Sequence, residues 1–221
     1  MDYLPIENYG IIGNMHTIAL CGTNGSIDWF CYPHFDSPSV FSSILDIDKG
    51  GYFRIQPVDQ SYTNKQFYWP DTNVLVTRFL TDEGVCEITD FLPVSKANST
   101  SAKNQLVRRI HCVRGHMKMH LECKPAFNYG RDEHTVQINE KGAAFHSPNL
   151  SLALSTSENL QEKHGMVFLN IDLQEGDSAN FVIQEIPAAT QPTICFSEDQ
   201  VMDGIKSTIT YWRDWLQQST Y

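Results

Sequence analysis

Short apolar or alternating runs, each closed by turn-forming residues, recur about every dozen residues through most of this chain. No repeat of fixed period accompanies them, so the pattern does not indicate a solenoid. Such spacing is typical of antiparallel strands in a sandwich or barrel. We therefore predict an all-β fold, a large antiparallel sandwich, with strands at 51–57, 73–80, 85–91, 106–112, 117–123, 143–145, 151–156, 166–173 and 179–186.

A first hairpin is predicted upstream of these runs. The apolar run 17–21 and the run 26–31 flank Asn24-Gly25. This dipeptide favours a type I′ turn, which needs a positive φ at both central residues. The pairing should end at Tyr32-Pro33, because proline cannot donate a hydrogen bond to a sheet.

Three further hairpins are predicted because a turn signal separates the members of each pair of runs. The pairs are 73–80 with 85–91, 106–112 with 117–123 around Arg114-Gly115, and 166–173 with 179–186 around 174–177. In 117–123, one face holds Met117, Met119, Leu121 and Cys123, and the other holds His116, Lys118, His120 and Glu122. The polar stretch 95–104 is predicted to be a surface loop, since the strand pattern resumes directly after it.

The strongest helix signal lies at the end of the chain. Ser197 and Gln200 have the spacing of a capping box. The apolar residues that follow at helical spacing are Val201, Ile205, Ile209, Trp212 and Leu216. A helix that carries both Trp212 and Trp215 needs a surface to pack on. It either folds back onto the sandwich or contacts a partner that this sequence does not contain.

Composition excludes several partners. The net charge of −10 argues against a nucleic-acid surface, which needs a basic patch. No apolar run reaches the roughly 20 residues of a membrane helix, and residues 1–5 lack the features of a signal peptide. We therefore predict a cytoplasmic protein whose six cysteines are reduced core residues. If the protein were exported, a disulfide between Cys21 and Cys31 would be the alternative.

The opening stretch resembles a known enzyme family. Residues 5–20, PIENYGIIGNMHTIAL, and 24–41, NGSIDWFCYPHFDSPSVF, are similar to the start of the two-domain glycoside hydrolases of family 15. This group contains bacterial and archaeal glucoamylases, glucodextranases and trehalases. Shorter segments that are also similar to the family are VCEITDFLP at 85–93, LVRRIHCVRG at 106–115, FNYG at 127–130 and YWRDWLQQSTY at 211–221. One departure is His34, which stands where the family usually has arginine.

The resemblance implies an N-terminal β-supersandwich at 1–196, two large sheets face to face. A linker helix at 197–221 would then lead into an (α/α)6 catalytic barrel. In the family, two glutamates of that barrel act as the acid and the base of an inverting reaction on α-glucosidic sugars. No position in this sequence can inherit those glutamates. The chain alone is therefore predicted to be inactive and to need no cofactor.

Asp28 and Asp36 invite a second interpretation, as the paired carboxylates of a glycosidase. The simpler interpretation is structural. Asp28 would accept hydrogen bonds from backbone amides beside a turn, and Asp36 would cap a short helix starting at Pro38. Trp29, Tyr32, His34 and Phe35 form an aromatic loop next to these aspartates. Flat rings beside polar groups suit sugars, so the loop would shape the barrel's sugar pocket or simply pack at the domain interface.

A zinc site is the hypothesis that the stretch 111–123 raises, through His111, Cys112, His116, His120 and Cys123. The alternation in this stretch predicts strands, in which residues four apart lie roughly 13 Å from one another. We therefore predict no metal, with Cys112 and Cys123 in the core. Arg108, Arg109 and Arg131 could pair with acidic neighbours or reach a ligand, and solvated or structural salt bridges are the default expectation.

The preferred function is that of a non-catalytic N-terminal domain which packs on the catalytic barrel and stabilises it. The alternative is a free-standing carbohydrate-binding or protein-interaction module. A third hypothesis is a mutarotase-like epimerase that would use His120 and Glu122. The terminal helix separates the first two: exposed Trp212 and Trp215 would favour a piece of a larger protein, and a helix that seals its own sandwich would favour a module.

Overall fold

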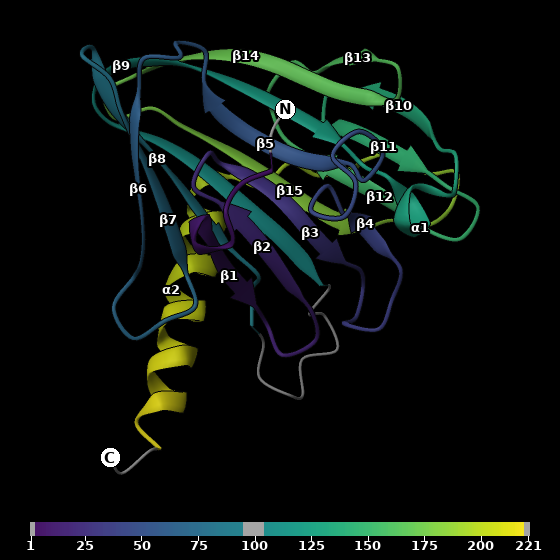
Figure 1. Cartoon of the computed structure of the whole chain (residues 1–221), viewed down its shortest axis with the longest axis horizontal. Helices are drawn as coiled ribbons and strands as arrows, with labels where there is room; N and C mark the ends of the chain where they lie inside the picture. The colour runs from purple at the N-terminus through teal and green to yellow at the C-terminus, as the bar shows by residue number, and fades with distance from the viewer. Residues whose placement is uncertain (1–2, 95–103, 219–221) are drawn as a thin grey trace.

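The computed structural model describes residues 3–94 and 104–218, and its strands form two stacked antiparallel sheets (Figure 1). Sheet A contains, in spatial order, β1 (Tyr9–Gly13), β2 (Ile18–Gly22), β3 (Ser26–Cys31), β5 (Tyr52–Pro57), the second half of β9 (Gln105–Lys124), β14 (Met166–Gln174) and β13 (Gln161–Lys163), with β4 (Ser39–Phe41) also paired to β3. Sheet B contains β6 (Thr63–Tyr68), β7 (Leu75–Leu80), β8 (Gly84–Phe91), the first half of β9, β15 (Ser178–Glu185), β12 (Ser151–Ser155), β11 (Gly142–His146) and β10 (Thr135–Asn139). Two short segments complete the fold: the 3-10 helix η1 (Ile6–Asn8), and α1 (Phe127–Gly130), a turn whose central residues are left-handed.

The core lies between the two sheets. Side chains from both sheets meet there, among them Phe30 and Phe53 from sheet A and Phe79, Phe145 and Phe181 from sheet B. Burial of this apolar surface is the main stabilising contribution to such a sandwich. The predicted all-β sandwich is therefore confirmed.

β9 corrects one predicted hairpin. The runs 106–112 and 117–123 form a single strand of twenty residues that passes from sheet B to sheet A. At the bend, Gly115 has a φ of 68°, and the register with β8 shifts between Val85 and Cys86. Gly115 is thus a bend in a strand and not the centre of a hairpin. The predicted faces of 117–123 are confirmed, because Met117, Met119, Leu121 and Cys123 are the buried ones.

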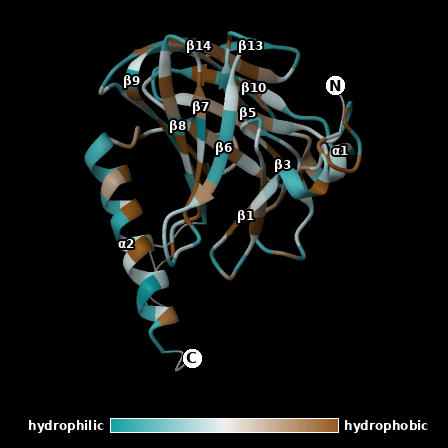
Figure 2. Cartoon of the chain, turned by 60° about the vertical axis from the view of Figure 1, so that its left-hand side comes forward, coloured by the Kyte–Doolittle hydropathy of each residue, from teal (hydrophilic) through white to brown (hydrophobic). Residues whose placement is uncertain are grey.

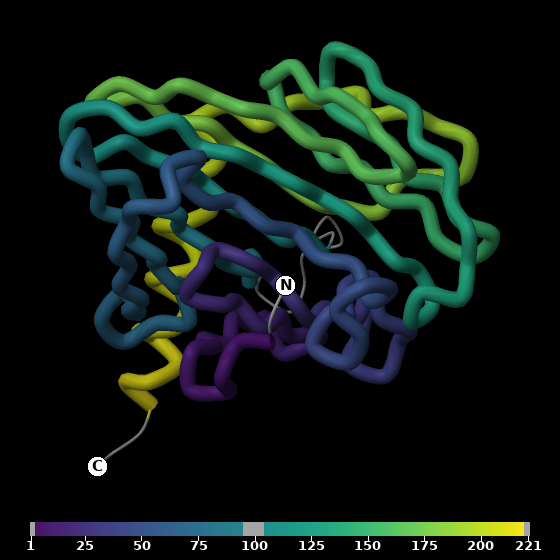
Figure 3. The backbone as a smooth tube through the Cα atoms, turned by 45° about the horizontal axis from the view of Figure 1, so that its top comes forward, coloured from purple at the N-terminus to yellow at the C-terminus, as the bar shows by residue number. Residues whose placement is uncertain are grey.

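The turn at 174–177 corrects a second hairpin. β14 pairs with the second half of β9 and β15 with the first half, so the two strands lie in different sheets. Figure 3 shows β9 and β14 running side by side along the molecule. The turn packs on the bend of β9: the Glu175 amide donates to the Gly115 carbonyl at 2.8 Å, and the Gly176 amide donates to the Cys112 carbonyl at 2.9 Å. The turn signals at Arg114-Gly115 and at 174–177 therefore both lie at the corner where the chain passes from one sheet to the other.

The first hairpin forms as predicted, but its turn differs. β2 and β3 are antiparallel neighbours, and Gly25 has a φ of 78° while Asn24 is not left-handed. The Gly25 amide donates to the Gly22 carbonyl at 2.9 Å. These features are typical of a three-residue loop that ends in a left-handed glycine, so the predicted type I′ turn is wrong. The hairpin at 73–80 and 85–91 is confirmed as β7 and β8.

Helix α2 (Glu198–Leu216) begins at the predicted capping box of Ser197 and Gln200. Its first half covers sheet B through a small apolar cluster of Val201 and Ile205 with Val107 and Val182. Arg109 on β9 binds Glu198 in the first turn of the helix, at 2.8 Å from Nε to Oε1. Figures 1 and 2 show the C-terminal end of α2 projecting beyond the strands.

Three other expectations concern single features. All six cysteines are free thiols, so the alternative Cys21–Cys31 disulfide is not formed. Of the predicted surface loop at 95–104, residues 95–103 lie outside the described residues. Among the helices that the structure describes, none has the length and apolar character needed to cross a membrane.

Candidate functional site

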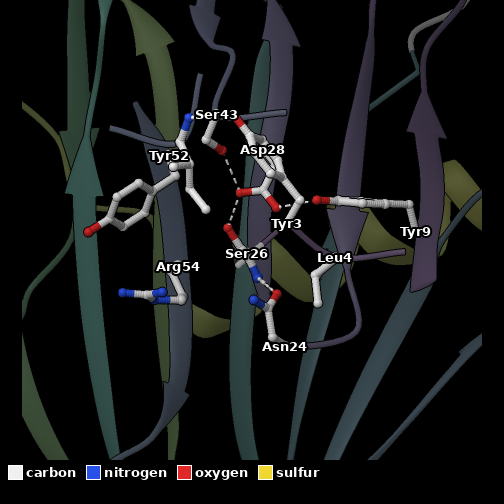
Figure 4. A pocket seen from close by; sticks show the side chains of 10 residues that line it. Tyr3, Leu4, Tyr9, Asn24, Ser26, Asp28, Ser43, Tyr52 and Arg54 are labelled. Carbon is white, nitrogen blue, oxygen red and sulfur yellow. Dashed lines mark hydrogen bonds between the residues drawn. The ribbon is translucent and has the colours of Figure 1, made fainter. Parts of the chain in front are cut away.

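Asp28 stands at the centre of a cluster of hydroxyl groups on the outer face of sheet A (Figure 4). Tyr9 and Ser43 each donate a hydrogen bond to its carboxylate at 2.8 Å. Ser26, two residues earlier on the same strand, donates a third. The prediction that Asp28 binds backbone amides is therefore wrong, because three side-chain hydroxyls hold it in place. Burial and the hydrogen bond to Asp28 raise the pKa of Tyr9, in that order of importance.

A pocket of about 200 Å³ opens beside Asp28. Tyr52 and Arg54 of β5 line the pocket and also bind Glu122 on the neighbouring strand β9. Burial, together with the negative charge of Glu122, raises the pKa of Tyr52 to about 12. Burial alone would raise the pKa of Glu122, but the hydrogen bond and charge of Arg54 outweigh it and leave the pKa lowered. The lining of the pocket therefore combines the rings of Tyr9 and Tyr52 with the charged groups of Asp28 and Arg54, which hydrogen bonds hold in place.

Replacing Asp28 with alanine is expected to lower the free energy of unfolding by about 2 kcal/mol. The substitution leaves the hydroxyls of Tyr9, Ser26 and Ser43 without their acceptor, and hydrogen bonds to a charged group contribute about 1.5–3 kcal/mol. The matched control is Asp36→Ala, at an exposed aspartate, with an expected change of about 0.5 kcal/mol or less. Urea unfolding of both variants gives the comparison. Equal midpoints would show that the cluster does not stabilise the fold.

The structure does not gather the six predicted site residues in one place. Trp29 is half-buried, with its ring centroid 6.4 Å from that of Tyr129. Tyr32 is buried; its hydroxyl donates to the Asn104 carbonyl at 2.8 Å and accepts from the Glu185 amide at 3.1 Å. His34, Phe35 and Asp36 are exposed in the loop that follows.

The short helix predicted at Pro38 is absent, and this expectation is wrong. Ser37 closes a turn with His34 instead, its amide donating to the His34 carbonyl at 3.1 Å. The chain then enters β4, where Val40 and Phe41 are buried in the core. Burial of these two side chains favours the extended backbone over a helical start. Asp36 does not line the pocket beside Asp28, so the two aspartates do not form the paired site of a glycosidase there.

The histidines and cysteines between 111 and 123 are dispersed. His116 lies 3.2 Å from Glu83, and His120 lies 2.7 Å from Asn170. Cys112 and Cys123 are buried in the core, as predicted. Within residues 3–94 and 104–218, no group of three metal-ligating side chains has an arrangement that could hold an ion.

Exposed apolar side chains gather around the C-terminal half of α2. Trp215 is 51% exposed and Leu216 is 41% exposed, while Trp212 is half-buried with its ring centroid 6.1 Å from that of Trp215. Two neighbouring loops contribute Met15 and Trp69, which are 52% and 44% exposed. We call these four exposed residues, Met15, Trp69, Trp215 and Leu216, the helix-end surface.

Contacts along α2 hold the helix-end surface together. The Tyr211 hydroxyl lies 3.7 Å from the Met15 sulfur, and the Arg213 side chain donates to the Pro70 carbonyl at 3.3 Å. These contacts fix the direction in which α2 leaves the sandwich. Sequence periodicity marked the apolar face of the helix, but it gave no sign of the two loops that extend this surface.

Comparison with known proteins gives a consistent result. The family model for the N-terminal domain of trehalase-like proteins matches residues 1–159. The trehalase of Thermoplasma volcanium is 33% identical over 99% of this chain and 35% of its own length. The trehalase of Thermoplasma acidophilum is 34% identical over 91% of this chain, and that of Mycobacterium tuberculosis is 26% identical over 96%.

The chain spans about a third of the length of each of these relatives. The match begins at the first residue of the chain and includes the hairpin, the Asp28 cluster and the bend of β9. The chain belongs to the family of trehalase-like N-terminal domains.

Proposed function

We propose that this chain is the non-catalytic N-terminal β-domain of an inverting α-glucosidic hydrolase similar to the glucoamylases and trehalases of family 15. Its role is to pack on a catalytic (α/α)6 barrel, to stabilise it and to help shape its sugar pocket. The names of the relatives support a sugar-cleaving parent protein, and the share of their length that the chain spans leaves room for a second domain.

The exposed half of α2 is the observation that carries this proposal. The first half of the helix is stabilised by sheet B, but Trp215 and Leu216 lie beyond that support. Exposed apolar patches of this kind mark interaction sites. Residues 1–196 are the β-domain in this proposal, and residues 197–221 lead into the barrel, whose surface covers the helix-end surface.

A free-standing binding module is the alternative, because the first half of α2 does cover its own sheet. Activity separates the two possibilities. We expect the purified chain to release no glucose from trehalose or maltose, and the protein extended through the downstream reading frame to release it. Turnover by the chain alone would contradict the proposal, and so would a reading frame that encodes no further domain.

Docking is tested in the extended protein with the variant Trp215→Ala. Its melting temperature is expected to fall, because the substitution removes apolar area from the interface between the domains. The matched control is Ile138→Ala on β10, where the side chain is 37% exposed and lies outside the helix-end surface. If both substitutions lowered the melting temperature equally, the helix-end surface would not be the contact with the catalytic domain.

A further inference from the structure

A hollow of about 340 Å³ lies where two motifs of the sequence meet. One wall comes from the loop after β3, through Tyr32 and Pro33, and from the start of β4, through Ser39. The opposite wall comes from the FNYG motif, through Phe127 and Asn128. The hollow is distinct from the pocket beside Asp28 and shares no lining residue with it. Its volume is at the lower end of the range for small-ligand sites, about 300–1,000 Å³, which suits a single sugar ring.

The FNYG wall holds an unusual backbone conformation. Asn128 and Tyr129 are both left-handed, with φ values of 52° and 59°. The Asn128 side-chain amide donates to the Asp132 carboxylate at 3.0 Å, and the amides of Arg131 and Asp132 donate to the Phe127 carbonyl at 3.1 and 3.2 Å. Two successive left-handed residues other than glycine are costly, and such strain is concentrated at ligand-binding segments. These hydrogen bonds fix the Asn128 amide and the Asp132 carboxylate at the hollow.

The charge of the lining restricts the ligand. Asp132 and Glu185 contribute carboxylates, and among residues 3–94 and 104–218 no lysine, arginine or histidine lines the hollow. An anion such as phosphate would meet negative charge without a basic partner. A neutral polyhydroxylated ligand can instead donate its hydroxyl hydrogens to both carboxylates. Pro33 and Leu150, which are half-buried and line the hollow, offer apolar surface for the C–H face of a sugar ring.

Ser39 supplies an independent sign of a ligand. Its side chain is fully buried and it lines the hollow, yet its hydroxyl has no hydrogen-bond partner among the described residues. Buried hydroxyl groups nearly always find a partner, so an exception requires an explanation. A ligand hydroxyl bound in the hollow would satisfy this group.

We propose that this hollow binds one neutral hexose ring, held by Asp132, Glu185 and Ser39. The chemistry of the lining selects a neutral polyol. The choice of a glucose unit as that polyol rests on the proposed function. The site lies within this chain and does not depend on a catalytic domain.

Saturation-transfer NMR on the chain with glucose or trehalose tests the proposal. We expect transfer to the ring protons at roughly millimolar sugar. The variants Asp132→Asn and Glu185→Gln should each weaken binding about tenfold, because each replaces a charged acceptor with a neutral one. The control is Glu140→Gln, an exposed residue in the turn after β10 that does not line the hollow and should leave binding unchanged.

Melting curves show whether each variant folds. If Asp132→Asn disturbs the FNYG turn, binding by Glu185→Gln still tests the proposal. Absence of transfer with both sugars would overturn the proposal, and so would equal binding by Glu185→Gln and Glu140→Gln. Hydrolysis is measured separately on the extended protein. Loss of sugar binding by the chain alone is therefore distinguishable from a parent protein that cleaves no α-glucoside.

Discussion

Replacing Arg108 with methionine is expected to lower the free energy of unfolding by about 3–5 kcal/mol. The guanidinium is fully buried and binds both carboxylate oxygens of Asp90, at 2.8 and 3.1 Å. It also donates to the carbonyls of Phe53 at 2.6 Å and Gly25 at 2.8 Å. Arg108 and Asp90 belong to sheet B, whereas Phe53 and Gly25 belong to sheet A and its first hairpin. One side chain thus joins the two sheets, and its loss leaves a buried carboxylate without its guanidinium partner and removes one hydrogen bond from each of two buried carbonyls.

Urea unfolding measures this effect, and the adjacent arginine supplies the control. Arg109 binds Glu198, whose side chain is 42% exposed, so Arg109→Met should cost about 1 kcal/mol or less. The double variant Arg108→Met with Asp90→Leu should recover stability relative to Arg108→Met, because it removes the unpaired charge as well. If Arg108→Met lost no more stability than Arg109→Met, the buried pair would not hold the sheets together.

The path of β9 explains how far the sequence predicts this fold. Alternation located both halves of the strand correctly, and it located the buried face of the second half, 117–123. The phase of the alternation changes around Gly115, and either a hairpin or a bend in one strand produces such a change. The choice depends on partners elsewhere in the chain, since β8 and β15 pair with the first half of β9 and β5 and β14 pair with the second half. Local pattern contains no information about those partners.

Edge strands were missed for a related reason. β6 (Thr63–Tyr68) and β13 (Gln161–Lys163) contain mostly polar, exposed residues. Neither strand buries a face, so neither has the alternation by which a strand is predicted. Their conformation is set by pairing with β7 and β14.

The candidate sites were only partly accessible from sequence. The motifs marked Asp28, Tyr32 and the FNYG turn, but their partners are distant: Tyr9 lies 19 residues from Asp28, and Arg54 lies 68 residues from Glu122. Serine and tyrosine hydroxyls have no sequence signature that would identify them as partners of a given carboxylate. Strand register alone brings these groups together.

Gly25→Ala is expected to lower the free energy of unfolding by about 3–5 kcal/mol. A Cβ at this position would lie well inside van der Waals contact with the Ile55 carbonyl oxygen, and the φ of 78° disfavours any L side chain. Ile55 cannot move away freely. Its amide donates to the Gly25 carbonyl at 3.1 Å, and its strand is paired with β9 at Leu121. The substitution would also displace the Gly25 carbonyl that accepts from Arg108.

Gly176→Ala separates the steric part of this effect from the conformational part. Gly176 also has a positive φ, of 90°, but a Cβ at this position would meet no atom within 4 Å. Its substitution should therefore cost only the backbone preference, about 1–2 kcal/mol. Equilibrium unfolding of the two variants gives the contrast directly. A similar loss in both would mean that the first hairpin adapts to a side chain at Gly25, and that the close approach of the β2–β3 turn to β5 is not a constraint on the sandwich.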